Sequence, residues 1–326
     1  MKLRTIFNLS PQPPPPGSRK LLGEGGARFG LPFPSEERTP GRGAGGEVAT
    51  WIDPAIAKRE DPDFTVQGEY VGKGLGLQLV ALGGGKFDGY LFEGGLPGAG
   101  WEPGKPRTQL KEEEALTLRK KLKRTERRSP TLGKKPLRGA VVLFNGSTTD
   151  AWQSGKKVMV ESGYLQATDC ITRQQFASYT LHLEFRTPYM PAARGQGRGN
   201  SGVYHSGRWE TQVLDSFGLE GRDNECGGIY SISKPRLNMC LPPLAWQTYD
   251  VEFTAATFDA VGKRTAWPRI TVRLNGVLVH ENLELTKDFT TSAPLTSPLA
   301  APEGPIFLQD HGNPVVYRNI WIVPRK

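Results

Sequence analysis

Short stretches in which apolar and polar residues alternate recur along this chain of 326 residues, mostly in its C-terminal part. Over 179–186, every second residue is apolar, as in a strand with one buried face. The stretches 141–144, 306–309 and 315–323 are also typical of strands, and Asn275-Gly276 joins two apolar runs as a hairpin turn would. The missing helical periods exclude a doubly wound fold, and the pattern predicts an antiparallel β-sandwich with one concave polar face.

The chain before this region changes composition twice. Residues 1–47 are rich in Pro, Gly and Arg, and we expect them to be disordered. Residues 48–104 predict a small β unit, with strands over 65–70, 75–82 and 86–92. The glycines at 83–85 are interpreted as a hairpin turn, because no helix with a Lys-Ser/Thr pair follows them as a phosphate loop requires.

Residues 105–138 predict a basic helical linker ahead of a sandwich domain at 139–326. The linker contains 13 Lys or Arg and 4 Asp or Glu, so its net charge of +9 equals that of the whole chain. A helix is expected over 109–128, with its acidic residues in the first turn and its basic residues later. No stacking aromatic residues accompany the basic run, which argues against a nucleic-acid partner.

Cysteine and hydropathy patterns narrow the class of protein further. The 3 cysteines are too few for a disulfide framework and lack metal-site spacing. Cys226 and Cys240 are interpreted either as a disulfide, if the protein is exported, or as two buried thiols. No apolar run approaches the ~20 residues of a membrane span. The apolar stretch at 6–9 is too short for an export signal, so no signal peptide is predicted.

The strand pattern at 209–214 carries the first candidate chemistry. Its period of two places Glu210 and Gln212 on one face, and Asp215 follows where the strand is expected to end. A carboxylate and an amide on a sheet face near aromatic rings are typical of carbohydrate sites. A solvated polar strand face is the alternative interpretation.

Four long phrases of the C-terminal part resemble the 3-keto-disaccharide hydrolase domain family. They are GNSGVYHSGRWETQVLDSFG (199–218), ECGGIYSISKPRLNMCLPPLAWQTYDVEF (225–253), ITVRLNGVLVHENLEL (270–285) and GPIFLQDHGNPVVYRNIWI (304–322). The resemblance spans about 140–324 and implies a concanavalin A-like jelly-roll sandwich that hydrolyses glycosidic bonds of 3-keto sugars. Residues 48–101 resemble the N-terminal region of some bacterial members. Members are usually exported, which implies a periplasmic or other extracytoplasmic location.

The chemistry of a 3-keto sugar explains which side chains such a site requires. A ketone at C3 acidifies the proton on C2 and makes the C1 oxygen a β-leaving group. One base near C2 and one acid near the glycosidic oxygen then suffice for elimination, and water can add at C1. Hydrogen-bond donors or a bound cation near O3 would stabilise the enolate.

Specific residues can be matched to these roles. Glu210 is the first candidate for the general base, and His311 is the candidate acid or metal ligand. Gln212 and Gln309 are candidate donors to hydroxyls or to the enolate. Each has a structural alternative, such as a buried ion-paired carboxylate for Glu210 or a turn histidine capped by Asp310 for His311.

Other candidates for substrate binding are Asn200, Ser201, Asp215 and Asp310. Asn200 and Ser201 lie between glycines and could instead shape the loop, and Asp215 could be a turn residue. Glu210, Asp215 and His311 together could hold a divalent cation. Because the sequence does not show that these three residues converge, no metal or other cofactor is predicted.

Two other classes of function stay open at this point. A jelly roll can be a non-catalytic, lectin-like module, or a structural protein whose polar face is only solvated. A catalytic carboxylate should be partly desolvated with a raised pKa, whereas a lectin carboxylate should be exposed and ionised. The expected partner is a carbohydrate, and no oligomeric state is predicted.

Overall fold

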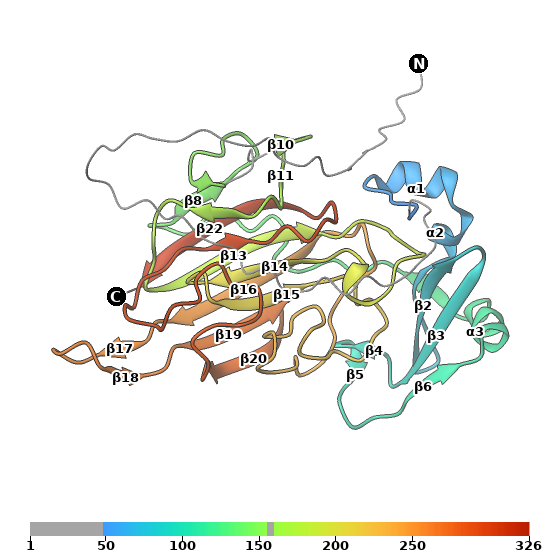
Figure 1. Ribbon diagram of the computed structural model, residues 1–326. Helices are drawn as coiled ribbons and strands as arrows, with labels where there is room; N and C mark the ends of the chain where they lie inside the picture. Colours follow the sequence, from blue (N-terminus) through green and yellow to red (C-terminus); the bar gives the residue numbers. More distant parts are fainter. Residues whose placement is uncertain (1–47, 155–159, 326) are drawn as a thin grey trace, which may run out of the picture. The chain divides into compact units, whose positions relative to one another are not determined.

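The computed structural model describes residues 48–154 and 160–325, which form mainly antiparallel β-sheet (Figure 1). Two sheets of the C-terminal part enclose a common apolar core, which confirms the predicted all-β sandwich. The disorder expected at 1–47 lies outside the described residues. None of the helices that the structure describes is long and apolar enough to cross a membrane.

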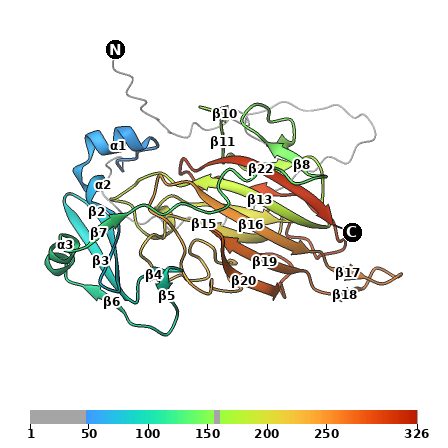
Figure 2. The same cartoon turned by 180° about the vertical axis from the view of Figure 1, so that it is seen from behind.

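The larger sheet has eight strands, which run side by side in Figure 2. In order across the sheet they are β10 (Val160–Glu161), β11 (Tyr164–Gln166), β22 (Val316–Arg325), β13 (Ser178–Arg186), β16 (Gln247–Thr254), β19 (Arg269–Leu274) and β20 (Val277–Glu284), with β8 (Val141–Phe144) paired to β22. Asn275 and Gly276, between β19 and β20, have φ of 52° and 79°. Positive φ at both positions confirms the predicted hairpin turn.

The smaller sheet has five strands, and its outer face carries the candidate site. In order they are β15 (Trp209–Val213), β14 (Ser201–His205), β21 (Phe307–Leu308), β12 (Cys170–Thr172) and β9 (Trp152–Gln153). Leu181 and Val251 from the larger sheet and Val203 and Leu308 from this one share the core, each at most 1% exposed. Burying such side chains stabilises the sandwich by roughly 1.5–3 kcal/mol each.

The N-terminal part forms a third sheet of five strands. In order they are β6 (Arg107–Leu110), β3 (Lys86–Glu93), β2 (Leu75–Gly83), β1 (Gly68–Gly72) and β7 (Lys123–Thr125). The helices are α1 (Pro54–Glu60), α2 (Pro62–Val66) and α3 (Glu112–Arg119), and a 3-10 turn lies at Gly195–Gly197. The remaining described elements are four short strands, β4 (Leu96–Pro97), β5 (Gly100–Trp101), β17 (Thr257–Phe258) and β18 (Arg264–Ala266). Gly83, Gly84 and Gly85 connect β2 to β3 with positive φ, as predicted for a hairpin.

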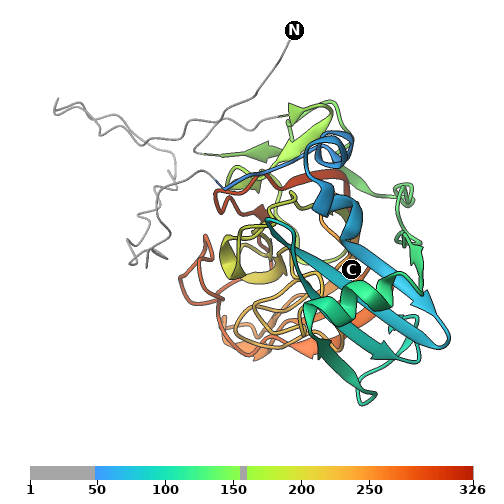
Figure 3. The same ribbon diagram turned by 90° about the vertical axis from the view of Figure 1, so that its right-hand side faces the viewer.

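Two local predictions are wrong in extent. The helix expected over 109–128 is limited to α3, and the residues on either side pair as the edge strands β6 and β7. Figure 3 shows α3 lying across the strands of the N-terminal sheet. The position of α3 on β3 depends on Gly89, because a Cβ there would overlap the side chain of Ala115. Tertiary pairing therefore outweighs helix propensity. The strand expected at 65–70 starts only at Gly68, because Asp61 caps α2 by accepting a hydrogen bond from Asp63 N.

Several long-range hydrogen bonds join the N-terminal sheet to the sandwich. Arg107 Nη2 donates to Gly218 O at 2.6 Å, and Arg198 Nη1 donates to Ala81 O at 3.2 Å. These bonds connect the N-terminal sheet to the segments on either side of the β14–β15 hairpin. The division into a β unit, a linker and a sandwich domain stays a prediction.

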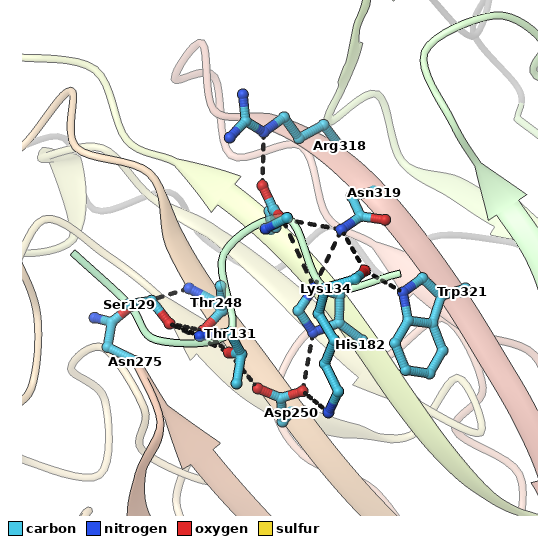
Figure 4. A network of polar contacts seen from close by, with 12 residues as sticks. Ser129, Thr131, Lys134, His182, Thr248, Asp250, Asn275, Arg318, Asn319 and Trp321 are labelled. Atoms are coloured by element: carbon cyan, nitrogen blue, oxygen red, sulfur yellow. Dashed lines mark hydrogen bonds and ion pairs between the residues drawn. The ribbon is translucent and has the colours of Figure 1, made fainter. Parts of the chain in front are cut away.

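Residues 129–136 cross the face of the larger sheet that points away from the core, and we call this segment the strap (Figure 4). Ser129 Oγ and Thr131 Oγ1 lie 2.6 Å and 2.9 Å from Thr248 Oγ1. Thr131 also donates to Asp250 at 2.6 Å, and Gly133 N donates to Glu184 Oε1 at 2.6 Å. The strap is thus hydrogen-bonded to the sheet along its length.

A buried histidine lies between the two carboxylates that the strap contacts (Figure 4). His182 Nδ1 is 2.9 Å from Asp250 Oδ1, and His182 Nε2 is 3.7 Å from Glu184 Oε1. Burial lowers the pKa of His182, but its hydrogen bonds to the two carboxylates outweigh burial and raise it. Burial raises the pKa of Glu184, yet donors including His182, Asn319, Gly133 N and Arg318 together lower it to about 2.

All three cysteines are buried and free. Cys226 and Cys240 are therefore two buried thiols in this structure and do not form a disulfide.

Candidate active site

The β14–β15 hairpin presents opposite faces to the core and to the candidate site. Val203 and Val213 belong to the core between the sheets. Glu210 and Gln212 point to the other face, where they line a pocket. This is the alternation that the sequence predicts for β15.

A half-enclosed pocket of about 40 Å³ opens on this outer face. The predicted site residues that line it together are Asn200, Glu210, Gln212, Gln309 and His311. The other lining residues are Gln196, Tyr230, Thr291 and Ser292. The pocket therefore joins the hairpin, the segment after β21 and three loops.

Glu210 is the only carboxylate among the described residues that line this pocket, and its side chain is almost completely buried. The residue is 3% exposed, and its Oε2 accepts a hydrogen bond from the Tyr204 hydroxyl at 2.9 Å. Burial raises the pKa of Glu210 to about 8, although the Tyr204 hydrogen bond favours the ionised form. The carboxyl group is consequently able to exchange a proton near neutral pH.

The burial of Glu210 comes from two loops that lie against β15. Tyr230 N donates to Glu210 O at 3.1 Å, and Gly227 N donates to Gln212 O at 3.1 Å, so residues 227–230 run along β15 as an extra partner. At the same edge of β15, Glu210 N donates to Thr290 Oγ1 at 3.1 Å. The same loops hold Tyr230, whose pKa is raised by its own burial and then by the Glu210 charge.

The hydroxyl of Tyr204 is shared among three groups. It lies 2.9 Å from Glu210 Oε2 and 2.9 Å from Thr291 O, and Gln309 Nε2 lies 3.3 Å from it. A hydroxyl has one proton and two acceptor positions. When Glu210 is protonated, it donates to Tyr204, Tyr204 donates to Thr291 O, and Gln309 fills the remaining acceptor position. Ionised Glu210 instead competes with Thr291 O for the single proton.

His311 lies on the segment after β21, at the exposed edge of the pocket. Glu210 and His311 thus share one concave surface, with the carboxylate buried and the imidazole open to solvent. This arrangement fits a base below a bound ligand and an acid near its leaving group.

Asp215 does not belong to the group of described residues that line the pocket. Its Oδ2 accepts a hydrogen bond from Arg198 Nε at 2.7 Å, and both side chains are at most 6% exposed. The carboxylate predicted to bind substrate is therefore half of a buried ion pair. A buried guanidinium needs such a partner, because desolvating it alone is costly.

Ser201 and Asp310 also lie outside the set of described residues around the pocket. Ser201 points toward the core, where its hydroxyl donates to Gln309 O at 2.6 Å and lies 2.8 Å from the Tyr317 hydroxyl. Asp310 Oδ1 accepts from Gly312 N at 2.8 Å, which is a turn contact. Both residues thus make contacts within the protein, and their binding roles stay predictions from the sequence.

Four residues of the lining and Tyr204 beneath it were not predicted from the sequence. Tyr204 alternates with Val203 in β14 and so shares a face with Gly202 and the pocket; this period-two pattern was available in the sequence. The loop residues Gln196, Tyr230, Thr291 and Ser292 carry no such periodic pattern. Their positions depend on how three separate loops cover the sheet.

The three residues considered for a cation, Glu210, Asp215 and His311, do not converge in the structure. Asp215 is paired with Arg198, whereas Glu210 and His311 line the pocket. Across 48–154 and 160–325, no three His, Cys, Asp or Glu residues are grouped so that they could hold a metal ion. A larger and more open depression of about 290 Å³, formed by residues 222, 223 and 232–234, has no buried residue in its lining. We therefore base the site on the smaller pocket.

Comparison with known proteins identifies the family of the chain. Residues 139–323 match the family of 3-keto-alpha-glucoside-1,2-lyase-like domains, and this chain belongs to that family. The match includes every residue that lines the pocket. Among curated proteins, no sequence matches the chain.

Solved structures resemble the sandwich to different degrees. A protein from Parabacteroides distasonis ATCC 8503, an inferred glycosyl hydrolase, is 32% identical with a TM-score of 0.52, and the match covers 58% of this chain and 84% of that one. A second inferred glycosyl hydrolase from the same organism is 19% identical, with a TM-score of 0.43 and coverage of 58% and 95%. Alginate lyase vAL-1 from Chlorella virus is 12% identical, with a TM-score of 0.31 and coverage of 54% and 92%. The family match and the first of these structures show that the chain is a member of a carbohydrate-acting family with a β-sandwich fold.

Proposed function

We propose that this protein cleaves glycosidic bonds of 3-keto-disaccharides or 3-keto-glycosides, with Glu210 as the base that removes the C2 proton. The observation that carries the proposal is the position of Glu210. It is a buried carboxylate at the base of an amide-lined pocket, and burial raises its pKa to about 8. A general base is most effective when its pKa lies near the working pH.

The state of Glu210 favours an enzyme over a lectin-like module. A carboxylate that only binds hydroxyl groups accepts their hydrogen bonds best as an anion, and exposure to water stabilises the anion. Glu210 is 3% exposed and is destabilised as an anion. Perturbed carboxyl groups of this kind gather at catalytic sites.

The proposed reaction has two steps that balance in protons. In the first, Glu210 takes the C2 proton, the electron pair forms the C1–C2 double bond by way of the C3 enolate, and the C1–oxygen bond breaks as His311 protonates the leaving oxygen. In the second, water adds across the double bond: its oxygen bonds to C1, its proton goes to His311, and Glu210 returns its proton to C2. The product is the free 3-keto sugar.

Gln309 is the best-placed donor for the enolate oxygen. Among the described residues, its Nε2 has only a long contact of 3.3 Å, to the Tyr204 hydroxyl, and Gln309 lines the pocket. Gln212 was predicted for the same role, but its Nε2 donates to Gln196 Oε1 at 3.1 Å. We therefore assign enolate stabilisation to Gln309 alone.

The decisive experiment compares an α-linked 3-keto-glucoside with the parent glucoside, which has a hydroxyl at C3. The wild-type chain should cleave the first and leave the second intact, because only the ketone makes the C2 proton acidic. Glu210→Gln keeps the shape and deletes the base, so kcat should fall by ~10²–10⁴. Deuterium at C2 should slow the reaction if proton transfer limits the rate.

Glu220→Gln is the matched control, since Glu220 is an exposed carboxylate whose side chain is 65% accessible. It should keep full activity. Cleavage of both glucosides at similar rates, or full activity in Glu210→Gln, would refute the substrate class or the base. Binding of sugar without cleavage of either glucoside would identify a lectin-like module instead.

A further inference from the structure

Two side-chain oxygens at the pocket have no hydrogen-bond partner among the described residues. They are Asn200 Oδ1 and Gln212 Oε1, and each residue is only 1% exposed. Both residues line the same pocket as Glu210. A buried acceptor that lacks a donor costs free energy, so a structure that keeps two of them side by side in one pocket calls for an explanation.

The orientation of both amides follows from a chain of hydrogen bonds through Gln196. The backbone oxygen of Asn224 can only accept, so the nitrogen of Gln196 must face it, at 2.8 Å. Gln196 Oε1 is then the acceptor for Asn200 Nδ2 and for Gln212 Nε2, each at 3.1 Å. Asn200 Nδ2 also donates to the backbone oxygen of Gln196 at 2.8 Å, which fixes that amide independently. Both nitrogens are thus used inside the protein, and both oxygens are left without a donor in residues that line the pocket.

The chemistry of these oxygens limits what they bind. A carbonyl oxygen accepts hydrogen bonds and cannot donate, so the ligand must supply donors. A divalent cation would also suit oxygen ligands, but it needs negative charge. Glu210 is the single carboxylate in the described lining, and burial raises its pKa. Hydroxyl groups are the neutral donors that satisfy two such oxygens.

The size of the pocket agrees with hydroxyl groups. Its volume of about 40 Å³ is room for one or two water-sized groups, which corresponds to one edge of a sugar ring and not to a whole disaccharide.

We propose that Asn200 and Gln212 form a subsite that accepts hydrogen bonds from two hydroxyl groups of the sugar, and that Gln196 is the positioning residue for both. The identification of the ligand as a sugar rests on the proposed function. The subsite also orients the substrate: a ketone oxygen is itself an acceptor and would be repelled by both amide oxygens. The oxidised carbon must therefore face away from Asn200 and Gln212, toward the donors on the Gln309 side of the pocket.

The test measures binding by calorimetry with the full chain. The probes are methyl α-glucoside and the analogues in which fluorine replaces one hydroxyl at a time, since fluorine cannot donate. If the plain glucoside does not bind, the same series is made on methyl 3-keto-α-glucoside and measured with Glu210→Gln, which prevents turnover. We expect two analogues to bind about tenfold more weakly than the parent, because each loses one hydrogen bond to a buried acceptor.

Variants assign each loss of affinity, which we call the penalty of the fluorinated analogue, to one oxygen. Asn200→Ala should abolish the penalty of one analogue, and Gln212→Met should abolish that of the other. Gln196→Met should reduce both penalties, because the two amides lose their common hydrogen-bond partner. A purely structural role of Gln196 would lower affinity for all analogues equally and leave their ratios unchanged. Gln109→Met, at an exposed amide on β6, is the matched control and should keep both penalties.

Several outcomes would overturn the subsite. They are equal affinity for all analogues in the wild type, penalties that persist in all three variants, failure of both glucosides to bind, or binding that disappears with EDTA and returns with a divalent cation. The wild-type series alone decides the matter if a variant does not fold. If the 3-keto-glucoside is cleaved but no analogue shows a penalty, the subsite is refuted and the proposed function stands. If two analogues show penalties but the 3-keto-glucoside is not cleaved, the subsite stands and the proposed function is refuted.

Discussion

The Tyr204 hydroxyl lies 2.9 Å from Glu210 Oε2 and equally far from Thr291 O, so one proton serves two acceptors. Protonation of Glu210 removes this competition, since the carboxylic acid can then donate to Tyr204. The contact thus links the charge of the proposed base to the arrangement of the pocket wall.

The first prediction concerns the pH dependence of activity. If ionised Glu210 is the base, kcat/KM should rise with pH through a midpoint of about 8, as its pKa requires, when the substrate is a nitrophenyl 3-keto-α-glucoside, whose leaving group needs no proton from His311. Tyr204→Phe removes the hydrogen bond that favours the anion, so the midpoint should move to higher pH. The measurement is kcat/KM against pH, with Tyr164→Phe as the control on β11. A midpoint that moves down or stays in place would contradict the hydrogen-bond assignment.

The second prediction concerns the glycine opposite the base. A Cβ at Gly202 would overlap Glu210 Oε1. Gly202→Ala should therefore displace the carboxylate and reduce kcat by at least tenfold, with a smaller change in thermal stability. Gly197→Ala is the matched control, because nothing lies within 4 Å of a Cβ there. Full activity in Gly202→Ala would mean that the position of Glu210 is not critical.

The third prediction separates a structural Asp215 from a substrate-binding one. Asp215→Asn should lower the free energy of unfolding by about 3–5 kcal/mol, since it leaves the Arg198 guanidinium buried without a counter-charge. Urea denaturation measures this loss. Glu220→Gln removes the exposed pair with Arg222, whose side chains are 65% and 69% accessible, and should cost less than about 1 kcal/mol. A stable Asp215→Asn variant with weakened sugar binding would restore the role predicted from sequence.

The fourth prediction concerns the charges beneath the strap. The pKa of Glu184 is about 2 in the folded chain and 4.5 ordinarily, so its contribution is present above pH 4.5 and is lost as the pH falls toward 2. The difference corresponds to ~3 kcal/mol. Wild type should therefore exceed Glu184→Gln in unfolding free energy at pH 6, and the gap should close by pH 2. His182 has the opposite sign: its pKa is raised, so its contribution is full below pH 6.5 and is lost as pH rises through the raised value.

A gap between wild type and Glu184→Gln that is independent of pH would argue against ionised Glu184. Glu252→Gln supplies the comparison, because the Glu252 side chain is 55% accessible on the neighbouring strand β16. It should show only a small gap at either pH.

The local pattern of the sequence was sufficient to predict the strands and the face on which the site lies. Alternation in β15 placed Glu210 and Gln212 together, and Asn275-Gly276 specified a hairpin turn. Such features depend on neighbouring residues along the chain, whose steric preferences and polarity are visible in the sequence. The resemblance of the long C-terminal phrases supplied the family.

Partners and burial were decided only by the tertiary structure. The sequence predicted that Asp215 binds substrate, yet its carboxylate is paired with the Arg198 guanidinium. The three amides of the proposed subsite come from a loop and two adjoining strand segments. Within the stretch expected to be a linker, β6 and β7 pair with β3 and β1, and the strap bonds to Glu184 and Asp250, all of them partners from other parts of the chain. A side chain's charge state and free hydrogen-bonding groups depend on what surrounds it, and those surroundings are made by residues tens of positions away. The sequence therefore determined which groups the site contains, and the packing of loops on the sheet decided which of them are free to act.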